Sequence, residues 1–146
     1  MEKPESSYNM IDWWKKVIFQ NYANFSGRAR RSEYWYFILF NVILFVPLYI
    51  IAIIGTVNES TGLSIFGFSL LGIGVIGIII PSLAVVVRRL HDLNKSGWYY
   101  FIRLIPLVGP IILLVWLCTE GDRHRNNYGE DPKNPALPEF DFDNRH

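Results

Sequence analysis

The residue types best suited to binding or chemistry gather in two short polar segments, the first of which runs from Gly27 to Phe37. Its eleven positions hold three arginines, one acid and four aromatic residues. Arginine binds phosphate groups through paired N–H donors, while Tyr and Trp favour the depth of lipid headgroups. The segment is interpreted either as an orientation anchor with an aromatic belt or as a binding site for a lipid headgroup or a partner. The residues of that candidate site are Arg28, Arg30, Arg31, Glu33 and Trp35.

The second polar segment runs from Arg88 to Trp98. His91 directly precedes Asp92, but adjacent residues on a helix point apart, and neither a nucleophile nor a set of metal ligands stands at a defined spacing from them. We predict no catalytic residue, no metal site and no cofactor. A cytoplasmic turn that fixes topology is the plainer interpretation, and a membrane enzyme that uses His91 for proton transfer is the weaker alternative. The candidate surface here comprises Arg88, Arg89, His91, Asp92 and Trp98.

Three apolar stretches border these segments and decide the fold class. They cover about residues 34–54, 63–87 and 98–118, and each is close to the roughly 20 residues that a helix needs to cross a hydrocarbon core. Helices of a small soluble domain would each need a polar face, and none of the three stretches has one. The sequence therefore predicts an all-α integral membrane protein with three transmembrane helices. The segment Pro106 to Pro110 leaves a re-entrant hairpin as the alternative for the third stretch.

The remaining residues predict an amphipathic helix and a polar tail. From about residue 9 to 25, apolar residues recur at helical spacing opposite charged ones, which predicts an interfacial helix or a helix packed on the protein itself. The tail from Thr119 to His146 is polar and rich in proline, and we expect it to be mostly unstructured. We expect residues 1–8 and 133–146 to be disordered. The whole chain, 1–146, is expected to form a single membrane domain.

The positions of lysine and arginine set the expected orientation, because short loops rich in these residues stay on the cytoplasmic side. They precede the first stretch, are missing from residues 55–62 and return in residues 88–97. The N-terminus is therefore predicted to be cytoplasmic, and three full crossings would place the tail outside. Arg103, the one charge inside the third stretch, lies about 7.5 Å beyond Trp98 along a helix. It joins the candidate surface by snorkelling to the headgroups or by pairing with Glu33 or Asp92.

Small residues recur in the second stretch. Gly72, Gly74 and Gly77 have the spacing of a dinucleotide-binding loop, but they lie inside an apolar run without the strand and the exposed helix start that such a loop needs. The residues that share one helical face instead allow another helix, from this chain or from a second copy, to approach closely. These are Gly67, Gly74, Gly77, Pro81 and Ala84. Together with Arg103, this face makes a subunit of an oligomeric transporter or channel the alternative function.

The overall composition narrows the class of partner. The 146 residues include 14 Lys and Arg and 13 Asp and Glu, so no basic excess indicates nucleic-acid binding. Only 18% of the residues are charged, whereas soluble domains carry about a quarter. The single cysteine, Cys118, excludes an intrachain disulfide.

Four motifs carry a resemblance to a known family. They are Gly27 to Trp35, Arg88 to Asp92 with Ser96 to Trp98, Ile105 to Gly109, and Asn126 to Pro132. In their order and spacing the chain resembles the YhaH/YhaI type of bacterial inner-membrane protein (domain of unknown function 805). The resemblance implies a small polytopic protein of the bacterial inner membrane and brings no established activity.

The residues and the resemblance together give one expected function. We expect a non-enzymatic inner-membrane protein that binds anionic membrane lipid, or a membrane protein partner, through a basic and aromatic cytoplasmic face. A second copy of the chain is another candidate partner.

Overall fold

The computed structural model describes residues 5–134, and in this range the chain forms helices and turns without a β-strand. These residues divide into two compact units. Residues 5–24 and 35–84 form the first, called here the helix-pair unit, and residues 25–34 and 85–134 form the second, called the motif unit. The two long helices, α2 (Arg31–Val57) and α3 (Thr61–His91), contribute residues to both units.

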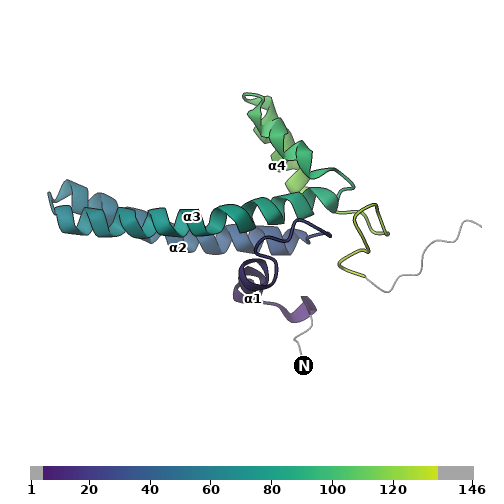
Figure 1. Ribbon diagram of the computed structural model, residues 1–146, viewed down its shortest axis with the longest axis horizontal. Helices are drawn as coiled ribbons and strands as arrows, with labels where there is room; N and C mark the ends of the chain where they lie inside the picture. The colour runs from purple at the N-terminus through teal and green to yellow at the C-terminus, as the bar shows by residue number, and fades with distance from the viewer. Residues whose placement is uncertain (1–4, 135–146) are drawn as a thin grey trace, which may run out of the picture. The chain divides into compact units, whose positions relative to one another are not determined.

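In the helix-pair unit, α2 and α3 run side by side and are joined by a short turn at residues 58–60 (Figure 1). They have 27 and 31 residues, and both are long and apolar enough to cross a membrane. Large apolar side chains such as Ile73 and Ile76 are about 70% exposed, as expected of helices that face lipid. The predicted stretches 34–54 and 63–87 are therefore helical, and each helix extends a few residues beyond the predicted ends.

The predicted face of small residues packs α3 against α2 of the same chain. A Cβ atom added to Gly67 would lie 2.7 Å from the Cβ of Ala52, and one added to Gly74 would overlap the ring of Phe45. Only close approach of the two helices leaves so little room, and glycine permits that approach. Gly77, on the predicted face, has no neighbour within 4 Å of an added Cβ.

The N-terminal amphipathic segment also belongs to the helix-pair unit. After the 3₁₀ turn η1 (Glu5–Ser7), α1 (Met10–Lys15) is capped by Asn9 and Asp12 and continues as the π-helical turn η2 (Lys16–Gln20). Trp13 is buried, and the Trp14 ring packs on Phe40 with centroids 4.7 Å apart. The helix ends at Gln20, short of the expected residue 25, and its apolar face packs on the protein itself.

The third apolar stretch does not form the single helix predicted over residues 98–118. It forms a hairpin of the 3₁₀ helix η3 (Gly97–Leu104) and the 11-residue α4 (Val108–Cys118) (Figure 1). Pro106 lacks an N–H and disfavours helix at the residue before it, and Ile105 is accordingly extended. Leu107 then reverses the chain at φ 64°. Eleven helical residues span only about 16 Å, so α4 by itself is too short for a hydrocarbon core about 30 Å thick.

The hairpin packs on the end of α3 within the motif unit. Val86 and Leu90 of α3 form a buried apolar cluster with Leu113 and Leu117 of α4. Gly109 lies so close to the carbonyl of Ile102 that an added Cβ would overlap it. The chain after Cys118 is therefore brought back to the end of α3, and this contact fixes the start of the tail.

The tail has defined contacts in the range that the structure describes. Residues 126–129 form a tight turn with an Asn126–Gly129 bridge. Residues 5–8 and 133–134, which were expected to be disordered, fall in the described range, where Glu5–Ser7 is a 3₁₀ turn and Lys133 bonds Glu120. Residues 1–4 and 135–146, the rest of the segments expected to be disordered, lie outside the described residues.

Candidate functional site

The site is assembled around the extended segment that precedes α2. The N–H of Ala29 donates to the carbonyl of Arg88 over 3.0 Å and pins this segment to the last turn of α3. The side chain of Arg28 is only 1% exposed as a result. Its Nε donates to Oδ1 of Asp92 over 2.9 Å, and its terminal nitrogens donate to the carbonyls of Asp122 and His124.

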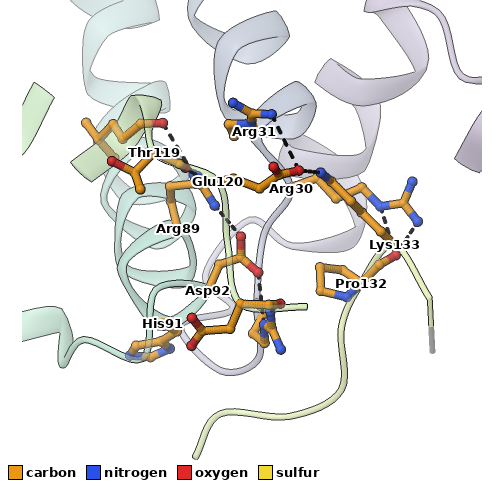
Figure 2. A network of polar contacts seen from close by, with 12 residues as sticks. Arg30, Arg31, Arg89, His91, Asp92, Thr119, Glu120, Pro132 and Lys133 are labelled. Atoms are coloured by element: carbon orange, nitrogen blue, oxygen red, sulfur yellow. Dashed lines mark hydrogen bonds and ion pairs between the residues drawn. The ribbon is translucent and has the colours of Figure 1, made fainter. Parts of the chain in front are cut away.

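Asp92 lies between two buried guanidinium groups. Its second oxygen accepts from Arg89, whose side chain is fully buried and also donates to the carbonyl of Thr119 (Figure 2). Burial raises the pKa of the Asp92 carboxyl above its ordinary value of 3.8, and Arg89 and Arg28 oppose that rise. The Asp92 carboxyl is thus in contact with two guanidinium groups at once. Gly121 passes so close to Asp92 that a side chain there would overlap the carboxylate.

A second buried ion pair joins the first turn of α2 to the end of α3. Nη1 of Arg88 donates to Oε1 of Glu33 over 2.5 Å, and the two side chains are 3% and 0% exposed. Nε and Nη2 of Arg88 are buried without a hydrogen-bond partner in the described structure. Within residues 5–134, the Arg88 side chain therefore depends on Glu33 for the compensation of its charge.

His91 fastens the turn of the tail to the same place. Its Nδ1 lies 3.2 Å from the carbonyl of Gly27, and its ring stacks on Tyr128 with centroids 3.8 Å apart. The amide of Asn126 donates to the carbonyl of His91 over 2.9 Å. The two residues proposed for the alternative enzyme, His91 and Asp92, are thus both engaged in internal contacts.

The remaining residues of the predicted surface lie nearer solvent. Nε of Arg30 donates to the carbonyl of Pro132 over 2.8 Å, and the exposed Arg31 donates to the carbonyl of Cys118. Trp98 is 78% exposed on η3. Trp35 is half-buried and belongs to the helix-pair unit, so the structure does not group it with the others.

Arg103 is exposed and makes neither of the ion pairs considered from the sequence. Its guanidinium donates to the hydroxyl of Tyr100 and lies over that ring, 5.0 Å from the centroid. Glu33 and Asp92 are bonded to Arg88, Arg89 and Arg28 instead. Tyr100 is three residues nearer the base of the hairpin, so the Arg103 side chain folds back towards that base.

A polar cavity of about 210 Å³ opens beside the network. Glu120 lines it, with Lys133 Nζ at 2.7 Å and Arg31 at 3.7 Å (Figure 2). Arg123 lies 3.6 Å from the same carboxylate. The hydrogen bond from Lys133 lowers the pKa of the Glu120 carboxyl most, and the other cations lower it further. Among the described residues, no group of three or more His, Cys, Asp or Glu side chains forms a metal site.

Sequence reasoning identified the arginines of this site but missed their acceptors. The carbonyl oxygens of Thr119, Asp122, His124 and Pro132 come from a tail that was expected to be unstructured. Every residue has a backbone carbonyl, so no residue type in the sequence marks these carbonyls as acceptors. The available signal was the presence of Asn126 to Pro132 among the four motifs, which indicates a structured role for that segment.

Comparison with known proteins covers most of this network. The profile of the family described as protein of unknown function (DUF805) matches residues 22–130. The chain belongs to the DUF805 family. The inner membrane protein YhaI of Escherichia coli (strain K12) is 41% identical to this DUF805 chain over 120 residues, which is 82% of this chain and 95% of YhaI. YhaH of the same strain is 39% identical over 125 residues, covering 84% and 98%. No solved structure matches this DUF805 protein.

The comparisons and the fold agree on the setting of this DUF805 protein. Its relatives are named inner membrane proteins, and it has two helices apolar and long enough to cross a membrane. The match from 22 to 130 includes Arg28, Glu33, Arg88, Asp92 and the carbonyls of Thr119, Asp122 and His124, whereas Pro132, the acceptor of Arg30, lies beyond it. A clamp of buried charges at the ends of the membrane helices is therefore part of the region that defines the family.

Proposed function

We propose that this protein is a non-enzymatic inner-membrane protein that binds anionic lipid headgroups at its cytoplasmic surface. The observation that carries the proposal is the position of the basic residues, most of which lie in the motif unit and the residues that follow it. Residues 25–34 and 85–146 contain 11 of the 14 Lys and Arg of the chain against nine Asp and Glu, an excess of two. Each basic residue near an anionic membrane surface contributes about 1 kcal/mol of attraction.

The exposed members of the predicted surface supply the contacts with lipid. Arg31 stands at the start of α2, and Arg103 and Trp98 lie on η3. Arginine suits bidentate binding of phosphate, and Trp suits the interface between headgroups and hydrocarbon. The buried Arg28, Arg88 and Arg89 have a different role, because their side chains already bind carboxylates or backbone carbonyls and hold the surface together.

The topology that fits this function has two crossings, α2 and α3, with both ends of the chain in the cytoplasm. Its support is that no Lys or Arg occurs from Ser32 to Val87, so every basic residue then lies on one side of the membrane, as short cytoplasmic segments require. The hairpin of η3 and α4, with Leu104 and Leu107 strongly exposed at its turn, enters the same leaflet and returns. The amphipathic segment α1 with η2 lies at the cytoplasmic headgroup level.

Reporter fusions test this topology. A reporter that is active only in the cytoplasm, joined after His146, is expected to be active, and one that is active only outside is expected to be inactive. The reverse result would require a third crossing and would separate the tail from the cytoplasmic arginines. Insertion of the same two reporters at residues 58–60 is expected to give the opposite pattern and serves as the control.

Lipid selectivity tests the function itself. The purified protein in nanodiscs of mixed composition is expected to retain phosphatidylglycerol in preference to phosphatidylcholine, as counted by native mass spectrometry. The variant Arg31→Gln/Arg103→Gln is expected to lose about 2 kcal/mol of this preference, and Arg31→Lys/Arg103→Lys is expected to retain most of it. Equal retention of both lipids by the unmodified protein would reject the proposal, and a protein partner would become the better explanation of the surface.

A further inference from the structure

Lys95 is held by two aromatic rings at the base of the hairpin, the end that adjoins α3. The turn after α3 fixes its backbone, because Asn94 adopts a φ of 53° and the N–H of Lys95 donates to the carbonyl of Leu90 over 3.0 Å. Its ammonium nitrogen lies 4.8 Å from the centroid of the Trp116 ring and 5.7 Å from that of Tyr99. These two rings meet edge to face with centroids 5.6 Å apart. The turn and both arms of the hairpin therefore set the position of this charge.

The two cations of the hairpin have no acid beside them. Residues 93–118 contain two basic residues, Lys95 and Arg103, and no Asp or Glu. The acids on either side, Asp92 and Glu120, already pair with other basic residues. In the part of the chain that the structure describes, neither Lys95 nor Arg103 forms an ion pair, and the ammonium of Lys95 donates no hydrogen bond. The hairpin thus carries two positive charges that no carboxylate compensates.

Both charges lie near the base of the hairpin, and its tip is apolar. The Arg103 guanidinium folds back over Tyr100, 5.0 Å from the ring centroid, and Tyr100 directly follows the Tyr99 that holds the first cation. At the turn between η3 and α4, residues 104–108 are all apolar, and Leu104 and Leu107 are 72% and 83% exposed. Charged and aromatic groups at one end and apolar groups at the other match the order of phosphates and acyl chains in one leaflet.

An ammonium group that lacks an acceptor beside Trp and Tyr rings suits the phosphate of a phospholipid. Its three N–H groups are all donors, and hydrogen bonds between a cation and phosphate are the stronger, charge-assisted kind. The rings order the flexible lysine side chain before binding, so less conformational freedom is lost when the phosphate arrives. The apolar tip favours a lipid over free phosphate, because only a lipid also supplies acyl chains to cover Leu104 and Leu107.

We propose that the base of the hairpin is a specific binding site for one anionic phospholipid, whose phosphate contacts Lys95 and Arg103 and whose acyl chains lie along the hairpin towards its tip. The inference rests on the proposed function, because it identifies where on the basic surface a lipid is held. Tyr99 and Trp116 are positioning residues, since they act on the phosphate through Lys95. Loss of Lys95 therefore has a larger effect than loss of an equal charge elsewhere on the protein.

The test compares phosphatidylglycerol binding by matched lysine variants of the full-length protein. Phosphatidylglycerol is titrated into phosphatidylcholine nanodiscs that hold the protein, and native mass spectrometry counts the lipid retained. Lys95→Gln is expected to weaken binding about fivefold, the effect of one basic residue, and Lys95→Arg is expected to keep most of the affinity. The control Lys15→Gln removes the same charge from an exposed position on α1 that has no ion pair among the described residues. It is expected to bind within about twofold of the unmodified protein.

The aromatic rings are tested at Tyr99, whose side chain is half-exposed and lies outside the apolar cluster of the motif unit. Tyr99→Leu removes one ring beside Lys95 and is expected to weaken phosphatidylglycerol binding about twofold to fivefold, the range of an exposed cation–π contact. Tyr99→Phe keeps the ring and is expected to bind like the unmodified protein. An unchanged tryptic pattern of the tail verifies that each variant keeps its fold.

The outcomes separate this inference from the broader proposal. Equal losses in Lys95→Gln and Lys15→Gln would overturn the specific site, while a general preference for anionic lipid would stand. Inorganic phosphate is added in a parallel series, and displacement of phosphatidylglycerol by an equal concentration of it would overturn the assignment to a lipid. Equal retention of phosphatidylglycerol and phosphatidylcholine by the unmodified protein would refute the proposed function and this site together.

Discussion

Replacing Asp92 with asparagine is the sharpest test of the charge clamp. Asparagine keeps the shape of the side chain and removes the negative charge that lies between Arg28 and Arg89. Both guanidinium groups are buried, with side chains 1% and 0% exposed, so water does not replace the missing carboxylate. The expected consequence is a tail that detaches from the end of α3.

The magnitude follows from the contacts that remain. Removing one partner of a buried ion pair costs about 3–5 kcal/mol. In Asp92→Asn, Arg28 keeps the carbonyls of Asp122 and His124, and Arg89 keeps that of Thr119. The loss therefore falls at the lower limit, about 3 kcal/mol, which corresponds to an increase of about a hundredfold in the population of the open tail.

Limited trypsin digestion of the protein in detergent measures this population. Arg123 and Arg125 are exposed trypsin sites in the tail, and cleavage follows the open population when opening and closing are fast. Asp122→Asn is the matched control, because its carboxylate is exposed and accepts only from the Asn126 amide among the described residues. Cleavage of Asp92→Asn at the rate of the unmodified protein would refute the clamp, as would equal acceleration by Asp122→Asn.

Three further predictions follow from other contacts. Glu33→Gln removes the one carboxylate that is bonded to buried Arg88 within residues 5–134, and it is expected to lower stability by about 3 kcal/mol. Adding Arg88→Met is expected to restore most of this loss. Thermal unfolding in micelles measures both variants, and a double variant no more stable than the single one contradicts this reasoning. Gly67→Val is expected to lower the free energy of unfolding by about 1–3 kcal/mol, because the larger side chain overpacks against Ala52. The control Gly72→Ala, whose added Cβ meets open space, should unfold at nearly the original temperature. Similar melting temperatures of the two variants would count against the packing of α2 on α3. Because Lys133 lowers the pKa of the Glu120 carboxyl, their contact stabilises the tail above pH 4.5, the ordinary pKa of Glu, and this stability is lost as the pH falls through the lowered pKa. Amide exchange in residues 119–133 should therefore accelerate only below pH 4.5. An acceleration of the same size in Glu120→Gln would disprove the assignment.

The two long helices were predictable because their cause is local. Uncharged stretches of more than 20 residues leave the backbone no better option in lipid than a helix. The end of each helix was harder to place, since Arg31 to Glu33 and Arg88 to His91 are polar and yet helical. In the third stretch, the prediction of one long helix relied on the apolar composition and gave less weight to Pro106. A positive φ at Leu107 could not be expected from the sequence, because leucine rarely adopts one.

The site was predictable in its residue types and not in its pairing. Arg28 and Asp92 are 64 positions apart, and a basic residue beside a membrane helix has the same sequence signature whether it fixes orientation or closes a buried ion pair. Only the return of the chain through the η3 and α4 hairpin brings the tail carbonyls to the arginines. That return depends on the break between η3 and α4, which the sequence offered only as the alternative for the third stretch.

The order in which the chain is synthesised gives the Arg28 contacts a further consequence. Its side chain receives partners from Asp92, Asp122, His124 and finally Gly129. A ribosome that has delivered α2 and α3 to the membrane has therefore made the arginine but none of its tail acceptors. Until the last of these residues leaves the ribosome, the nascent protein carries an incompletely compensated charge at the bilayer edge. Premature termination before residue 122 leaves the Arg28 side chain without any of its tail acceptors, so such a truncated chain keeps only the Asp92 contact for this charge.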